Sequence, residues 1–340
     1  MKNPIFYIII ICLLSGCNNK QSDIVNLYTQ RHYKVDEIQY KNFEKLTGIK
    51  VNVVKSNADE LIERLRNEGE NSEADIFISV DAGKLQKAAS MGLLQNMSDD
   101  IQTGNIINSL LDVNDIWLPL TYRARILVYS NDRVDVSELD SYESLSNEKW
   151  KNRILVRSSS NAYNQALMAS VIANNGYDGA KKWSKGIVEN LARSPKGNDR
   201  DQVKAIYSGL GDVAIVNSYY IGLLLSSEKE EERKAGEAVS VFFPNQAENQ
   251  RGTHINISGM GITKNAPNLE NAITLMNYLL SEEAQNTYVK NSYEYSVNEN
   301  VKPSEIVQKW GNFRIDSLDL NNLGVYREEA IEVFETTGWK

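Results

Sequence analysis

One histidine and four tyrosines are the side chains of this sequence whose types and positions suggest chemistry: His32, Tyr33, Tyr163, Tyr219 and Tyr220. The chain has 17 tyrosines, and most tyrosines pack as amphipathic side chains, so none of the four is informative alone. What they share is that each cluster closely follows a segment with the character of a β-strand. An isolated phenol keeps its proton up to about pH 10, so tyrosine becomes a metal ligand only where a strong Lewis acid displaces that proton.

Iron(III) is the ion that this set of ligands fits best. It is hard and highly charged, whereas zinc and copper usually bind imidazole and thiolate, and the chain has only two histidines and two cysteines. Four phenolates would over-neutralise a divalent ion and roughly suit a trivalent one. Together with one imidazole they make five ligands, which leaves a position for water or a small anion. The residue types alone also permit iron(II) bound by phenols that keep their protons.

Three strand-like segments must position these side chains, at residues 24–28, 153–157 and 213–216. Ligands of open parallel sheets bind beyond the carboxyl ends of the strands, so we expect all three clusters to face one cleft. Adjacent side chains of a regular strand point to opposite faces. Tyr219 and Tyr220 can therefore reach one ligand only if the chain turns after the strand, and their position beyond residue 216 permits that turn.

Strands and helices alternate at intervals typical of parallel βαβ units, which predicts an α/β fold. A mature chain of roughly 320 residues exceeds one compact core and favours two domains. Extended segments at 117–129 and 239–244 suit a crossing into a second domain and a return. We therefore predict a discontinuous first lobe, 23–120 with 245–340, a second lobe, 121–244, and a hinged ligand cleft between them.

The N-terminal segment predicts export. Lys2 precedes an apolar run that is too short for a comfortable membrane span, and Leu14-Ser15-Gly16-Cys17 has the small residues and the cysteine of a bacterial lipoprotein signal. We expect residues 1–16 to be a signal peptide, Cys17 to carry lipid, and 17–22 to tether the protein to the periplasmic or cell-surface face of a membrane. An ordinary cleaved signal and a short membrane anchor are the alternatives.

Composition argues against several classes of protein. The net charge of −8 makes the chain a poor partner for nucleic acid. Once Cys12 leaves with the signal and Cys17 is acylated, no thiol remains for a disulfide or a nucleophile. The sequence lacks the Gly-x-Ser-x-Gly, His-Glu-x-x-His and phosphate-loop motifs of common enzymes. We therefore expect a monomeric binding protein and not an enzyme.

Four segments resemble motifs of the ferric-iron-binding proteins of bacterial ABC importers, particularly the Fut-type branch. Arg31-His32-Tyr33 resembles the first metal motif, 157–165 the segment with the third ligand, 217–220 the paired-tyrosine motif, and 252–259 a shared segment without ligands. The resemblance runs in order from about Val25 to Lys340. It implies a two-lobed periplasmic-binding-protein fold of class II, with two crossover strands, which captures iron(III) and delivers it to an ABC permease and its ATPase.

The resemblance also implies how the ligands are divided between the lobes. The first lobe would supply His32 and Tyr33, and the second would supply Tyr163, Tyr219 and Tyr220. Part of the wider family holds an anion such as carbonate with an arginine. The candidates for that role, or for pairing with phenolate charge, are Arg123, Arg31 and Arg200, and Arg123 is preferred. An ordinary ion pair with a carboxylate is the alternative for each arginine. His254 is expected to be a hydrogen-bonded structural residue.

A binding protein of the same fold for another small solute is the alternative function. Aromatic clefts also hold organic cations such as a polyamine or thiamine, and the fold accommodates many ligands. The two functions differ in what they require of the tyrosines, because iron needs the hydroxyls whereas an organic cation needs mainly the rings. A purely structural lipoprotein is the least supported class.

Overall fold

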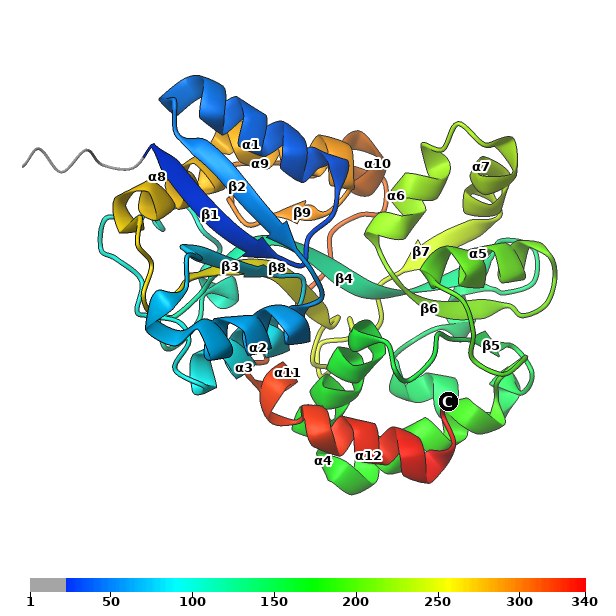
Figure 1. Ribbon diagram of the computed structural model, residues 1–340. Coiled ribbons are helices and arrows are strands. Elements are labelled where there is room, and N and C mark those ends of the chain that lie inside the picture. Colours follow the sequence, from blue (N-terminus) through cyan, green and yellow to red (C-terminus); the bar gives the residue numbers. More distant parts are fainter. Residues whose placement is uncertain (1–22) are drawn as a thin grey trace, which may run out of the picture.

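The computed structural model describes residues 23–340, which form two lobes joined by a long strand (Figure 1). Residues 1–22 lie outside the described part of the chain, and with them the predicted signal peptide and Cys17. Within residues 23–340, no helix combines the length and the apolar character needed to cross a membrane.

The first lobe begins with parallel strands, each followed by a helix. Its elements are β1 (Ile24–Thr29), α1 (Lys34–Thr47), β2 (Lys50–Lys55), α2 (Ala58–Glu68), β3 (Ile76–Ser79) and α3 (Ala82–Ser90). β1 pairs in parallel with both β2 and β3. Local sequence sets the helix ends: the side chains of Asn57 and Asp81 accept hydrogen bonds from backbone N–H groups of the first turn, and Gly48 ends α1 at a left-handed φ of 76°.

The strand that joins the lobes is β4 (Leu118–Ser130). The second lobe continues with β5 (Ile154–Leu155), α4 (Ala162–Glu189), α5 (Asp199–Tyr207), β6 (Val213–Asn217), α6 (Tyr219–Leu225), α7 (Glu230–Glu237) and β7 (Val239–Phe242). The first half of β4 pairs with the strand of the returning chain, and its second half, from Arg125 onward, pairs with β6 and β7. One strand therefore belongs to both lobes.

The chain then returns to the first lobe. The returning elements are β8 (Ile255–Ile262), α8 (Leu269–Leu280), α9 (Glu282–Ser292), β9 (Tyr295–Ser296), α10 (Glu305–Gln308), α11 (Asn322–Val325) and α12 (Arg327–Thr337). The sheet order is β2-β1-β3-β8-β4-β6-β5, with β7 and β9 also paired to β4. β8 runs antiparallel to both β3 and β4, and this places the junction of the lobes at the centre of the sheet.

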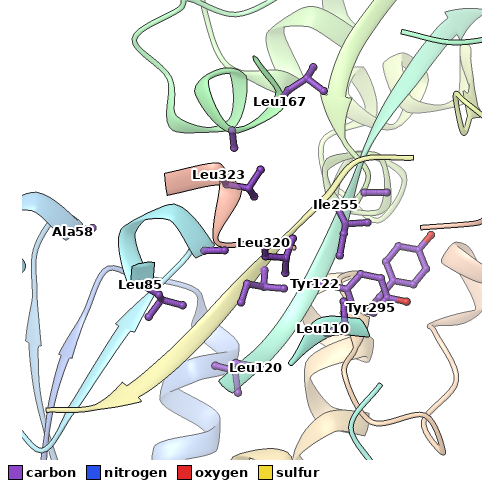
Figure 2. Packing of buried hydrophobic residues seen from close by; sticks show 14 of the residues in the cluster. Ala58, Leu85, Leu110, Leu120, Tyr122, Leu167, Ile255, Tyr295, Leu320 and Leu323 are labelled. Carbon is purple, nitrogen blue, oxygen red and sulfur yellow. The ribbon is translucent and has the colours of Figure 1, made fainter. Parts of the chain in front are cut away.

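Buried apolar side chains pack along the β4–β8 pair. Figure 2 shows Leu120 and Tyr122 of β4, Ile255 of β8, and Leu320 and Leu323 from the segment at α11. The ring of Tyr122 stacks on that of Tyr295, with centroids 5.0 Å apart. Each fully buried side chain of this size contributes about 1.5–3 kcal/mol to folding, so the junction is part of the continuous core.

The last helix lies outside the lobe that we expected for it. α12 packs along α4 of the second lobe, and the two helices lie side by side in Figure 1. We expected all of 245–340 to belong to the first lobe. Because α12 packs on α4, it belongs to the second lobe instead. Trp339, just after α12, is buried beside Trp183 and Phe334, and this apolar packing holds the segment there.

Candidate metal centre

Three of the predicted ligands meet at the cleft between the lobes. Tyr33 immediately precedes α1, Tyr163 is the second residue of α4, and Tyr219 is the first residue of α6. The rings of Tyr33 and Tyr219 meet edge to face with centroids 6.2 Å apart. The hydroxyl oxygens of Tyr163 and Tyr219 are 3.4 Å apart. Tyr219 therefore contacts one phenol from the first lobe and one from its own lobe.

The chain makes the turn that the paired tyrosines require. β6 ends at Asn217, and α6 begins two residues later. The backbone N–H of Ser218 donates to Ala124 of β4, which fixes the turn against the central strand. The rings of Tyr219 and Tyr220 lie 4.2 Å apart between centroids, so both face the same region.

His32 is exposed and lies beside the tyrosines. Its ring stacks on that of Tyr33 with centroids 5.2 Å apart. Its Nδ1 is 3.4 Å from the backbone oxygen of Gln30. In that orientation Nε2 is the ring nitrogen that can reach a ligand in the cleft.

A cavity of about 670 Å³ opens next to these side chains. Its lining includes His32, Tyr33, Tyr219 and Tyr220. Water occupies roughly 30 Å³ per molecule in the liquid, so the cavity has room for more than a single ion. The site can therefore hold an ion together with water or a small anion.

Burial keeps three of the phenols protonated in the free protein. Burial, followed by the neighbouring phenol of Tyr163, raises the pKa of Tyr33 well above its usual value. Burial and the phenols of Tyr33 and Tyr163 raise the pKa of Tyr219 in the same way. For Tyr220, burial is again the largest cause of a raised pKa, followed by Tyr163 and Asp199. A metal ion that binds these oxygens as phenolates must therefore displace their protons.

Three arginines surround the ring of Tyr163. The guanidinium carbons of Arg123, Arg125 and Arg157 are 5.4, 6.0 and 5.5 Å from its centroid. Arg125 and Arg157 share the carboxylate of Asp199, with N–O distances of 2.5 Å to each. The motifs did not identify Arg125, Arg157 or Asp199 as part of the site. Arg157 was detectable because it begins the 157–165 segment, whereas no motif of the sequence points to Asp199.

Arg123, the preferred anion candidate, is 2% exposed and has no carboxylate partner among the described residues. Its Nη2 donates to the backbone oxygen of Val80, and its Nη1 is buried without a hydrogen-bond partner in residues 23–340. A buried guanidinium nitrogen without an acceptor is costly. The arrangement fits an arginine that faces a negative ligand.

The other two candidate arginines differ from Arg123. Arg31 is buried and paired with Asp36 at 2.8 Å and Glu294 at 3.3 Å, and its guanidinium lies 4.8 Å from the ring centroid of Tyr33. Those carboxylates already satisfy its charge. Arg200 lines the cavity, with its guanidinium 5.8 Å from the ring centroid of Tyr220.

His254 lies in the junction of the lobes. Its backbone oxygen accepts from the N–H of Arg125 at 2.9 Å, next to the start of β8. Burial, followed by Arg251 and Arg125, lowers the pKa of its imidazole well below the usual value. It is a neutral, buried histidine at the hinge, in keeping with the structural role expected for it.

Clusters of the side chains that most often bind metals are absent from the part of the chain that the structure describes. No group of three or more histidine, cysteine, aspartate or glutamate side chains in residues 23–340 could hold a metal ion. The tyrosine cluster is the candidate metal centre among residues 23–340, and its oxygen donors suit a hard, highly charged ion.

Two α/β lobes, a shared central strand and a ligand cavity between them define a two-lobed solute-binding protein. The model of the family described as bacterial extracellular solute-binding protein matches residues 39–315, and the chain belongs to that family. The predicted fold class is thereby confirmed.

Several of the relatives are named for iron. Iron uptake protein A1 of Synechocystis sp. is 42% identical over 316 residues, covering 93% of this chain and 87% of its own. A solved structure of Trichodesmium FutA (IdiA) in complex with iron and citrate ligands is 44% identical with a TM-score of 0.88, and the match covers 93% of this chain and 100% of that one. The ferric binding protein from Campylobacter jejuni is 39% identical with a TM-score of 0.86, at 93% and 100% coverage. These matches confirm the kinship predicted from the motifs.

Proposed function

We propose that this protein captures iron(III) outside the cytoplasm and delivers it to an ABC importer. The observation that carries the proposal is that four phenols and one imidazole, from three separate chain segments and both lobes, contact one another. All of them except Tyr163 line one cavity, and the Tyr163 hydroxyl lies beside that of Tyr219. The similarity to iron uptake and ferric-binding proteins supports the same ion. His32, Tyr33, Tyr163, Tyr219 and Tyr220 are the proposed ligands.

On this proposal, the lobes close when the metal binds. His32 and Tyr33 lie beside α1, and the other three ligands lie on α4 and α6, so one ion attached to all five joins the lobes. Release then requires the lobes to separate, which a permease with its ATPase would drive at the membrane. The chain belongs to a family of solute-binding proteins, and we propose no catalytic role.

A second part of the proposal concerns the cell envelope. Residues 1–16 would direct export, and lipid on Cys17 would hold the protein at a membrane through the 17–22 tether. Replacing Cys17 with alanine should move the protein from the membrane fraction to the soluble fraction. Retention of Cys17→Ala in the membrane fraction would contradict lipid anchoring and leave iron capture unaffected.

An anion is proposed to complete the site. Arg123 is the proposed anion-facing residue because its Nη1 is buried without a partner in residues 23–340. Arg200 lines the cavity and is the second candidate. Carbonate is the anion that we propose for this place.

The visible absorption spectrum of the iron-loaded protein tests the proposal. Phenolate bound to iron(III) gives a yellow-to-red charge-transfer band, so protein purified with ferric citrate should show that band and lose it to a stronger chelator. Tyr219→Phe should weaken or shift the band, whereas Tyr207→Phe, which changes an exposed tyrosine away from the cavity, should leave it unchanged. A protein that stays colourless with ferric citrate, and whose melting temperature does not move, would overturn iron capture.

A further inference from the structure

Helix α6 contacts the first lobe through a glycine, Gly222. Gly222 is buried and lies directly against Tyr293, the residue that ends α9. A Cβ atom at position 222 would be 2.6 Å from Cβ and 2.8 Å from Cδ1 of Tyr293, and closer still to Cγ. Carbon atoms normally approach to about 3.5–4.0 Å, so any other residue at 222 would push the two lobes apart by roughly 1 Å.

Rotation of the tyrosine ring cannot remove this clash. Turning χ1 moves Cγ and Cδ1 but leaves Cβ in place, and Cβ is itself too close. The backbone of Tyr293 is also constrained, because it has the left-handed φ of 58° that ends α9, a conformation uncommon for a side chain of this kind. The contact therefore depends on glycine at 222.

The same helix carries two of the proposed ligands. Tyr219 is three residues before Gly222, so both lie on one face of α6. On that face Tyr219 meets Tyr33, and Gly222 meets Tyr293, which are both residues of the first lobe. Two points of contact between the lobes are thus one helical turn apart.

We propose that Gly222 is a positioning residue for metal capture, because it lets α6 close onto Tyr293 and so brings Tyr219 and Tyr220 within reach of an ion held by His32 and Tyr33. Gly222 has no donor atom and touches no metal; it acts through the closeness of the lobes. This inference rests on the proposed iron capture. On this proposal Gly222 and Tyr293 separate when the lobes open, so a methyl group at 222 destabilises the closed form relative to the open one.

The test measures how fast iron leaves. Gly222→Ala and wild-type protein, both loaded with ferric citrate, are mixed with excess EDTA, and the charge-transfer band is followed by stopped flow. Gly222→Ala should release iron at least about tenfold faster, which corresponds to about 1.4 kcal/mol. Melting temperature of the metal-free variant should not fall, since alanine favours the helix. Gly104→Ala, at an exposed glycine with open space around it, is the control and should behave as wild type.

A double variant separates the contact from other effects. Tyr293→Gly removes both Cβ and the ring, and glycine accepts the positive φ. In that background Gly222→Ala should change the release rate less than about threefold, because neighbouring substitutions that share one contact are not additive. An unchanged rate in Gly222→Ala, or an equal acceleration in both backgrounds, would overturn the inference. Failure of wild-type protein to take up iron would instead overturn the proposed function, so the two failures are distinct.

Discussion

Replacing Asp199 with asparagine should reveal how much the arginines around Tyr163 depend on one carboxylate. Asp199 is fully buried at the start of α5. Its two oxygens accept from Arg125 and Arg157 at 2.5 Å each, and one of them also accepts from the backbone N–H of Asn217 at 3.1 Å. Asparagine keeps the shape but removes the charge, so two buried guanidinium groups lose their counter-ion.

The magnitude follows from the burial of all three groups. The side chains of Asp199 and Arg125 are at most 2% exposed, and that of Arg157 is 15% exposed. Removing one partner of a buried ion pair typically costs about 3–5 kcal/mol, because the remaining charge is left without compensation. Against a total stability of about 5–15 kcal/mol, that loss is large.

Urea unfolding of the metal-free protein, followed by tryptophan fluorescence, measures the change. The matched control is Asp59→Asn, which removes an exposed carboxylate paired with Lys84 and Lys87, and should cost at most about 1 kcal/mol. If Asp199→Asn lowered the free energy of unfolding no more than the control, the buried ion pairs would not be what holds this part of the second lobe, and the reasoning would be refuted.

Three further outcomes are expected of the metal site. Tyr219→Phe should weaken the charge-transfer band and hasten iron release with little change in melting temperature; an unaltered band would remove Tyr219 from the ligand set. His32→Ala should hasten release in the EDTA assay but keep the band, because phenolates give the colour; a bleached protein would contradict this division of roles. Iron affinity, measured by competition with citrate, should fall on acidification. Each of the four proposed phenol ligands gives up a proton when it binds as phenolate, so the logarithm of the affinity should rise by up to about 4 per pH unit. The raised pKa values of Tyr33, Tyr219 and Tyr220 extend this dependence to high pH, and a flat profile would mean that the phenols bind without deprotonation.

The tyrosine positions could be predicted because they depend on local pattern. Tyr33, Tyr163 and Tyr219 each follow a strand, and the carboxyl ends of strands in an α/β sheet lie at one edge. The paired tyrosines required a turn of the chain after the strand, and the structure has that turn between Asn217 and Tyr219. Their role as ligands stays a prediction that the colour assay tests.

The partners of the arginines could not be predicted from the sequence. Arg31 pairs with Glu294, 263 residues away, and Arg125 pairs with Asp199, 74 residues away. Periodicity reports which face of an element is buried, but it carries no information about which distant charge lies opposite. The position of α12 was missed for the same reason, because its packing on α4 depends on contacts between distant segments.

The charges around the phenols favour a site that holds several phenolates and an anion. Beside Tyr33, Arg31 faces the carboxylates of Asp36 and Glu294, which leaves one negative charge. Around Tyr163, three arginines, Arg123, Arg125 and Arg157, share the carboxylate of Asp199, which leaves two positive charges. Arg200 lines the cavity and adds another, so the framework carries two formal positive charges. Four proposed phenolates with iron(III) carry one negative charge, and the single positive charge that remains is what the proposed anion would offset. Four phenolates without a metal would instead leave buried negative charge, which is costly to desolvate. Three of the four proposed phenolates also come from the lobe that holds Arg125 and Arg157, where positive charge exceeds negative.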